Sequence, residues 1–330
     1  MCRPSPYGRL CHKQIKLNKH LKDHTVENIT RTVYGSHVQT CLFFGKPVTF
    51  KDNSTLNQKF SILQDTLPST TDRIALAGFV WGNRGHRLEA GADGIPRNQV
   101  VQHRATDAGL YGQLPFVLRE VNNDLTALQR ANYALRRQES HGGVTYWAYY
   151  VRRLDSAGIQ PNMYYTEVTS AADGQPVENV VAFTPTAAHL SPTPPAISNT
   201  GTNVISADYV SSRAHMVIKL TEADVAEMLN VAKVIYGDES YAIISELGLC
   251  TLANKTINAP SYGGGTFTFT EAIGVQIAAH VATYSSLMFN NTGAEIEMEV
   301  GANEPLFAIG DHYGSFTLGA ASATGTAVAS

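Results

Sequence analysis

Three long stretches of this chain carry no charged side chain, and this limits the surfaces that the folded chain can present to water. Asp, Glu, Lys and Arg are all absent from residues 179–207, 272–294 and 312–330. Charged residues make up 16% of the 330 residues, whereas soluble domains usually carry about a quarter. A free monomer normally needs more surface charge than this to stay soluble. We therefore expect polar uncharged side chains or a neighbouring subunit to cover part of the surface, as in a component of an assembly.

The N-terminal segment carries the opposite charge from the rest of the chain. Residues 1–31 hold seven basic and two acidic side chains, so their charge is +5 and that of the remainder is −8. Four lysines recur at steps of three residues: Lys13, Lys16, Lys19 and Lys22. We expect these lysines to contact a partner. Both DNA, through its phosphates, and an acidic face of another subunit fit this charge.

The cysteines and the apolar runs predict neither a disulfide scaffold nor a membrane partner. Four cysteines are too sparse for a disulfide-rich secreted domain, and we interpret them as mainly reduced. The first residues contain no apolar run of the kind found in a secretory signal. The best transmembrane candidate, residues 272–289, is interrupted by Gln276, His280 and several hydroxyl side chains. It is therefore better explained as a buried or interface helix.

Composition and linker signals predict a mixed α+β chain in five segments. Its central part would be a mixed sheet with an aromatic strand region, and its C-terminal part a helix–strand unit. The predicted segments are a basic extended arm (1–58), a central α+β domain (59–190), a Pro/Ser/Thr-rich linker (191–207), a helix–strand subdomain (208–318) and a flexible tail (319–330).

Hydrophobic periodicity predicts both strands and helices. The strand candidates are residues 73–81, 144–151, 162–168, 177–184, 215–220 and 295–300. An amphipathic helix over residues 114–137, broken near Asn122 to Asp124, follows from leucine and valine steps of three and four. A further helix would begin at the capping box of Thr221 and end at Gly237. Residues 239–247 and 271–290 are also expected to be helical, the second as a core helix or as a contact with a copy of itself.

A glycine-rich loop at residues 82–87 follows the first of these strands. Its sequence GNRGHR lacks the pattern of a P-loop or of a dinucleotide-binding loop. We favour a tight loop at a subunit contact, with Arg84 and Arg87 as interface residues, over a phosphate site.

Histidines and cysteines offer candidate metal and acid–base groups. Those of residues 2–41 lack the paired spacing that a zinc ion needs. We predict no metal and no cofactor. His86, His103 and Asp107 could serve a hydrolase if the fold brought them together in one pocket. This cytoplasmic hydrolase or transferase is the enzymatic alternative, and we do not favour it.

Four segments carry a resemblance to a known family: FVWGNRGHR (79–87), GADGIP (91–96), residues 103–115 and EVGANEPLF (299–307). They resemble virion structural proteins of tailed bacteriophages, over roughly residues 60–310. The resemblance implies a non-enzymatic component of the virion, made in the host cytoplasm and present in many copies in the tail, baseplate or neck. A head or decoration protein is the alternative. The partners would be copies of the chain and other virion proteins.

Overall fold

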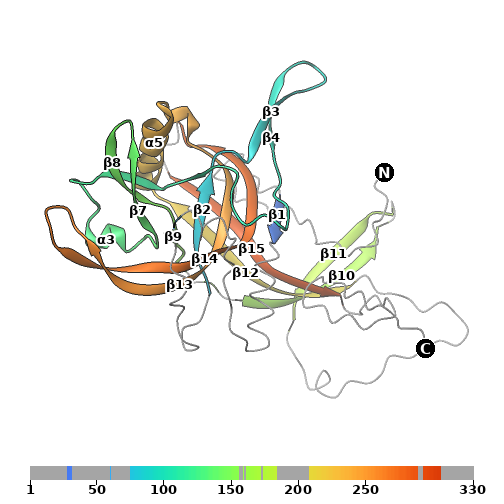
Figure 1. Cartoon of the computed structure of the whole chain (residues 1–330). Coiled ribbons are helices and arrows are strands. Elements are labelled where there is room, and N and C mark those ends of the chain that lie inside the picture. The colour runs from blue at the N-terminus through green and yellow to red at the C-terminus, as the bar shows by residue number, and fades with distance from the viewer. Residues whose placement is uncertain are drawn as a thin grey trace, which may run out of the picture. The chain divides into compact units, whose positions relative to one another are not determined.

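The computed structural model describes residues 28–31, 60, 75–155, 159, 161–171, 174–183, 208–288 and 293–305. Among them, 59% lie in strands and 12% in helices. The predicted α+β class is therefore wrong, because the described fold is rich in β-structure (Figure 1). These residues divide into two compact units. The larger holds those up to Asp155 and those from 217 to 297, and the smaller holds those between 159 and 216 and from 298 onward.

A six-stranded antiparallel sheet forms the centre of the larger unit. Its order is β1-β14-β13-β2-β5, and β9 also pairs with β2. The strands are β1 (Asn28–Arg31), β14 (Thr266–Ser286), β13 (Ile243–Pro260), β2 (Ala75–Gly82), β5 (Gln113–Leu114) and β9 (Arg152–Arg153). Strand β2 confirms the strand predicted at residues 73–81. The core of this unit includes the fully buried Trp81, Leu247 and Val281.

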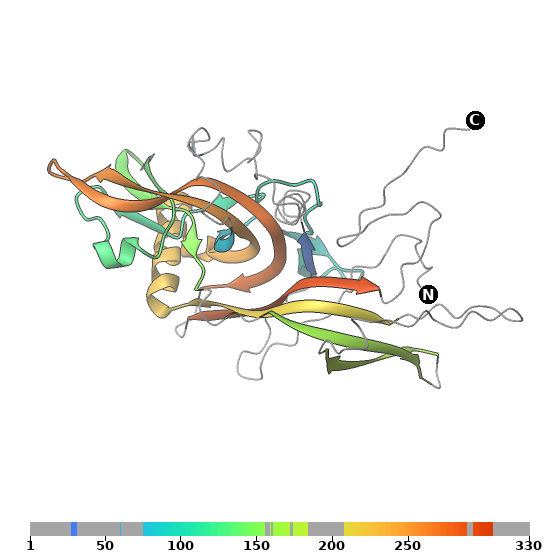
Figure 2. The ribbon, with the colours of Figure 1, turned by 90° about the horizontal axis from the view of Figure 1, so that it is seen from below.

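Strands β13 and β14 form a long hairpin that Figure 2 shows to be strongly curved. Register shifts interrupt their pairing at three places, one of them between Ile244 and Glu246. Such bulges bend a strand and change the direction of its side chains. The predicted helix over residues 271–290 is therefore wrong. Both faces of β14 are largely buried from Ala272 to Thr283, so its sequence has the continuous apolar character that a buried helix would also have.

The helix predicted over residues 239–247 is also wrong. A single 3-10 turn covers Glu239–Tyr241, and β13 begins at Ile243. Strand pairing therefore outweighs the local helical pattern here.

Of the cysteines, Cys250 is free and buried within β13, while the other three lie outside the described residues.

A three-stranded sheet replaces the helix predicted over residues 114–137. Its order is β6-β8-β7, with β6 (Val117–Glu120), β8 (Val144–Tyr149) and β7 (Arg136–His141). The only helical part is α3 (Ala127–Arg130), whose N-cap is Thr126 rather than a residue of the predicted break. Leu128, which the periodicity placed on a buried face, is 84% exposed. Strand β8 confirms the aromatic strand, although only Ala148 and Tyr149 within it are buried.

The helix predicted from Thr221 to Gly237 is confirmed as α5 (Glu222–Tyr236). Thr221 and Asp224 form a capping box, and Gly237 ends the helix with a φ of 80°. Val225, Met228, Val231 and Ala232 are buried, and Asn230 donates a hydrogen bond to the carbonyl of Leu118 in β6. Among the described helices, none has the length and apolar character needed to cross a membrane.

The smaller unit contains most of a four-stranded sheet with the order β11-β10-β12-β15. Its strands are β11 (Pro176–Ala182), β10 (Pro161–Ser170), β12 (Tyr209–Leu220) and β15 (Ala294–Pro305). They confirm the strands predicted at 162–168, 177–184, 215–220 and 295–300. Ile296 and Met298 are buried while Glu295 and Glu299 are exposed, so β15 alternates as expected. The predicted linker and tail lie outside the described residues, and so does the arm apart from β1.

A two-stranded ribbon, β3 (His86–Ala90) and β4 (Pro96–Val100), forms a sheet of its own. Figure 1 shows it standing out from the larger unit to which it belongs. The chain enters the ribbon from β2 through residues 83–85 and leaves it through residues 101–112, which lead to β5. We call residues 86–100 the ribbon.

Candidate functional site

Glu246 is the centre of a buried polar cluster where the ribbon joins the large sheet. It lies in β13 directly after the bulge, and its side chain is 0% exposed. The neighbouring Ser245 is fully buried as well. An extra residue in a strand re-aims the side chains beside it. Ser245 reaches the segment that enters the ribbon, and Glu246 reaches both the segment that enters it and the one that leaves it.

Four donors satisfy the carboxylate of Glu246. Oε1 accepts hydrogen bonds from the backbone N–H of Gly112 at 2.8 Å and of Arg84 at 3.3 Å. Oε2 accepts from the backbone N–H of Tyr111 at 2.8 Å and pairs with Nε2 of His103 at 2.8 Å. A buried carboxylate is tolerated only when such partners replace its hydration. Since Arg84 precedes the ribbon and the other three follow it, the carboxylate holds both of its ends.

Two glycines make room for this arrangement. Gly82 pairs with Glu246 across the sheet, and a Cβ at Gly82 would lie 2.4 Å from Oε1 of Glu246. A Cβ at Gly85 would lie 2.6 Å from the carbonyl oxygen of Ser245. The N–H of Gly85 donates to Oγ of Ser245 at 2.9 Å. The glycines of the GNRG loop are thus explained by close packing against β13, not by phosphate binding.

Three aromatic rings stack on one another beside the carboxylate. The ring of His103 lies parallel to that of Tyr111, with centroids 4.1 Å apart, and to that of His280, with centroids 3.9 Å apart. Two rings cannot occupy the same face, so His103 lies between them. The side chain of His103 is 0% exposed, whereas Tyr111 is 46% exposed. Tyr111 therefore covers the cluster on its solvent side.

His280, in β14, is held as a neutral imidazole. Burial and then the neighbouring His103 lower its pKa to about 4. Its Nε2 lies 3.1 Å from the carbonyl oxygen of Asp107, so this nitrogen carries the proton and donates it. Burial also lowers the pKa of His86 and outweighs the opposite effect of Glu246. Both histidines therefore lack charge at neutral pH.

The structure brings together two of the three residues considered for a hydrolase. Nδ1 of His103 lies 3.4 Å from Oδ2 of Asp107, but Asp107 is itself engaged by the N–H of Arg104 at 2.8 Å. The ring of His86 packs edge-on against Tyr284, with centroids 5.0 Å apart. The ring of Tyr111 covers His103, so a substrate in the solvent does not contact the His103 imidazole. This geometry suits a structural role better than acid–base catalysis.

Two of the residues predicted to form an interface, Arg84 and Arg87, lie among the described residues. Arg84 and Arg87 are exposed, and Nε of Arg87 forms an ion pair with Oε1 of Glu89 at 2.6 Å within the ribbon. Their contact with a partner stays a prediction. Lys13, Lys16, Lys19 and Lys22 lie outside the described residues. In the part of the chain that the structure describes, no three His, Cys, Asp or Glu side chains are placed to hold a metal ion.

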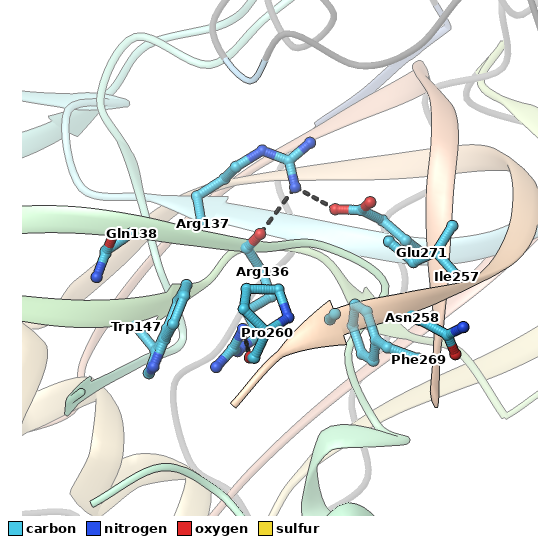
Figure 3. Close-up of a pocket in the computed structure, with 10 residues that line it drawn as sticks. Arg136, Arg137, Gln138, Trp147, Ile257, Asn258, Pro260, Phe269 and Glu271 are labelled. Carbon is cyan, nitrogen blue, oxygen red and sulfur yellow. Dashed lines mark hydrogen bonds and ion pairs between the residues drawn. The ribbon is translucent and has the colours of Figure 1, made fainter. Parts of the chain in front are cut away.

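A surface pocket of about 230 Å³ lies between β7, β8 and the β13–β14 hairpin. Figure 3 shows Arg137 pointing toward Glu271 at one side of it, with which it forms an ion pair. Arg136 pairs with Asp124 at 2.5 Å and lies 3.3 Å from the ring centroid of Trp147. The two cations of the pocket are thus already paired within the chain. This pocket is a weaker candidate site than the cluster around Glu246.

Sequence reasoning missed Glu246, Tyr111 and His280. Glu246 and His280 were assigned to helices, which removed them from the sheet that brings them to His103. The GNRG loop was the one local signal, because closely spaced glycines often mark a close approach of other chain segments.

Comparisons with known proteins add a family but no function. A search of curated proteins and a search of solved structures each found no match. A family model matches residues 18–314, which is most of the chain, and it is described as a family of unknown function. The chain belongs to this family, DUF7208.

Proposed function

We propose that this chain is a structural component of a many-copy assembly, in a bacteriophage virion at the tail, baseplate or neck. The resemblance of residues 79–87, 91–96, 103–115 and 299–307 to virion structural proteins supports the virion. The charge-free stretches support an assembly, because contacts between subunits would cover surfaces that lack charge. The head or decoration protein remains the alternative position.

The observation that carries the proposal is the closed cluster around Glu246. Its carboxylate uses its two oxygens on four donors from the segments at both ends of the ribbon. The cluster therefore fixes the base of an element that is exposed along nearly its whole length. Three of the four segments that carry the resemblance contribute to this base or to the ribbon. A rigid base and an exposed ribbon suit a protein that presents a contact surface.

The hydrolase alternative receives less support from the same geometry. His103 is fully buried, and its Nε2 faces a carboxylate that three backbone N–H groups also engage. A general base needs an open path to the proton that it removes. In the described residues, the ring of Tyr111 stacks on His103 and blocks that path.

Light scattering on the purified full-length chain tests the proposal. A self-assembling component should show a defined multiple of the 35.7 kDa chain mass, and electron microscopy should show closed particles or filaments of one kind. A single-chain mass at every concentration, with no regular particle, would overturn the proposal.

A further inference from the structure

Residues 101–112 lead from the ribbon back to the large sheet, and we call them the return segment. His103 is the only buried residue within it. Among the described residues, every hydrogen bond that involves a side chain and links this segment to the rest of the chain ends on Glu246 or His280. Backbone hydrogen bonds to Asn83 and Gly85 hold its two ends. Opening of this segment would expose little apolar surface, so it can occur while the rest of the fold stays intact.

His280 fits beneath the return segment only as a neutral ring. Its Nε2–H donates to the carbonyl of Asp107 at 3.1 Å, and its Nδ1 is buried without a hydrogen-bond partner among the described residues. A second proton would attach to Nδ1 and create a buried, charged N–H group without an acceptor. The ring of His103 lies against this imidazole, with centroids 3.9 Å apart. Because a buried donor without an acceptor is costly, and a charged one more so, the closed segment disfavours the imidazolium form of His280.

The surroundings of His280 do not compensate for such a charge. The titratable groups that face it are Glu246 from β13 and His103 and Asp107 from the return segment, while β1 places Thr30 opposite it in the sheet. The carboxylate of Glu246 already accepts from four donors, and that of Asp107 accepts from a backbone N–H of its own segment. Burial and then His103 therefore outweigh the attraction of the two carboxylates and lower the pKa of His280 to about 4.

We propose that His280 makes the return segment an acid-sensitive switch, which is closed on the sheet at neutral pH and opens when His280 takes up a proton. Opening lets water reach both the imidazolium and the carboxylate of Glu246, so neither charge remains buried without a partner. It also releases the base of the ribbon on the side of β4. The inference goes beyond the proposed function and does not depend on it, because the switch lies within a single chain.

The direction of the pH effect follows from the two states of His280. A histidine exposed to water has a pKa of about 6.5, whereas that of His280 in the closed form is about 4. The open form therefore binds the proton more tightly, and opening becomes more favourable as the pH falls below about 6.5. The ratio of open to closed segments should be about 30-fold higher at pH 5 than at pH 7.5.

Hydrogen–deuterium exchange of the full-length chain at pH 7.5, 6 and 5 tests the switch, once the rates are corrected for the intrinsic effect of pH. Protection of the Tyr111 and Gly112 amides should fall about 30-fold between pH 7.5 and pH 5, while the amides of α5 keep their protection. In His280→Gln, the side-chain amide can still donate to Asp107 but takes up no proton, so the fall should nearly disappear. The matched control is His86→Gln, which removes the other histidine whose pKa burial lowers and should retain the full fall.

Three results would overturn the inference. The first is an equal fall in His280→Gln and the natural chain, which would assign the opening to another group. The second is a parallel loss of protection in α5, which would indicate global unfolding. The third is constant protection of Tyr111 and Gly112 over the whole pH range.

The natural chain alone decides the matter if His280→Gln does not fold. Uptake of a proton by His280 predicts a fall in protection of about sevenfold between pH 6 and pH 5. A carboxylate, with a pKa of about 4 in water, would give almost no change in this interval. Protection that falls only below pH 5 would therefore reject His280 as the switch.

Discussion

The Glu246 cluster and the ribbon are neighbours that reverse the usual distribution of polar and apolar side chains. In the cluster, a carboxylate and two histidines are fully buried. In the ribbon, Leu88 and Ile95 lie in water. Four donors satisfy the buried carboxylate of Glu246, whereas the exposed apolar groups have no cover among the described residues. The first region therefore holds two segments of the chain together, and the second leaves an apolar surface in water.

Removal of the Glu246 carboxylate should lower the free energy of unfolding more than any other change considered below. Glu246→Ala leaves three backbone N–H groups and His103 without their acceptor, so we expect a loss of about 3–5 kcal/mol in the free energy of unfolding. Urea denaturation followed by fluorescence measures it. The matched control is Glu89→Ala, which removes an exposed glutamate of the ribbon and should cost at most about 1 kcal/mol. Similar losses in both variants would contradict the role given to the cluster.

The buried His280 should make stability depend on pH. The pKa of a histidine in an unfolded chain is about 6.5, and that of His280 in the folded chain is about 4. Between these pH values the unfolded chain binds a proton that the folded chain does not. Stability is therefore fully present above pH 6.5 and falls as the pH drops toward 4, by about 3 kcal/mol in total. Urea titrations at a series of pH values should show this fall reduced in His280→Gln. An identical pH profile in the variant would exclude His280 as its source.

Gly82→Ala should have an intermediate effect. A Cβ there meets Oε1 of Glu246 at 2.4 Å and the carbonyl oxygen of Gly112 at 2.7 Å, and neither can move without breaking the cluster. We expect a loss of about 1–3 kcal/mol. In the control Gly91→Ala, the Cβ meets an exposed side-chain atom of Asp93 at 2.6 Å, which can turn away. A thermal melt of both variants tests whether the site is as tightly packed as described.

Leu88→Ser should have the smallest effect on the isolated chain. Its side chain is 67% exposed, so the free energy of unfolding measured below the concentration of assembly should change by less than about 0.5 kcal/mol. A clear loss of stability in the monomer would show that Leu88 packs within its own chain.

Local signals explain which elements could be predicted from the sequence. Helix α5 was predictable because the signals for both of its ends, the capping box at Thr221 and the terminal Gly237, are local in the sequence. Strands β10 and β11 were predictable because a turn with Gly174 separates two short alternating segments. The ribbon was assigned no structure, and its first two residues, His86 and Arg87, were counted in the glycine-rich loop.

The cluster could not be predicted, because its members are far apart in the sequence. His103 and Asp107 were singled out because they are near one another, but Glu246 is 143 residues away from His103. Strands β13 and β14 were mistaken for helices in part. Much of each strand is buried on both faces of the sheet, and this removes the alternation that marks a half-exposed strand. Without these two strands, nothing brings Glu246 or His280 to the ribbon.

Hydrogen–deuterium exchange on the full-length protein, compared below and above the concentration of assembly, distinguishes a rigid cluster from a ribbon that a second copy covers. We expect slow exchange of the Tyr111 and Gly112 amides in both samples, because Glu246 accepts their hydrogen bonds. We expect the amides of the ribbon to become protected only in the assembled sample. Ribbon amides that exchange equally fast in both samples, or Tyr111 and Gly112 amides that exchange as fast as those of the ribbon, would contradict these expectations.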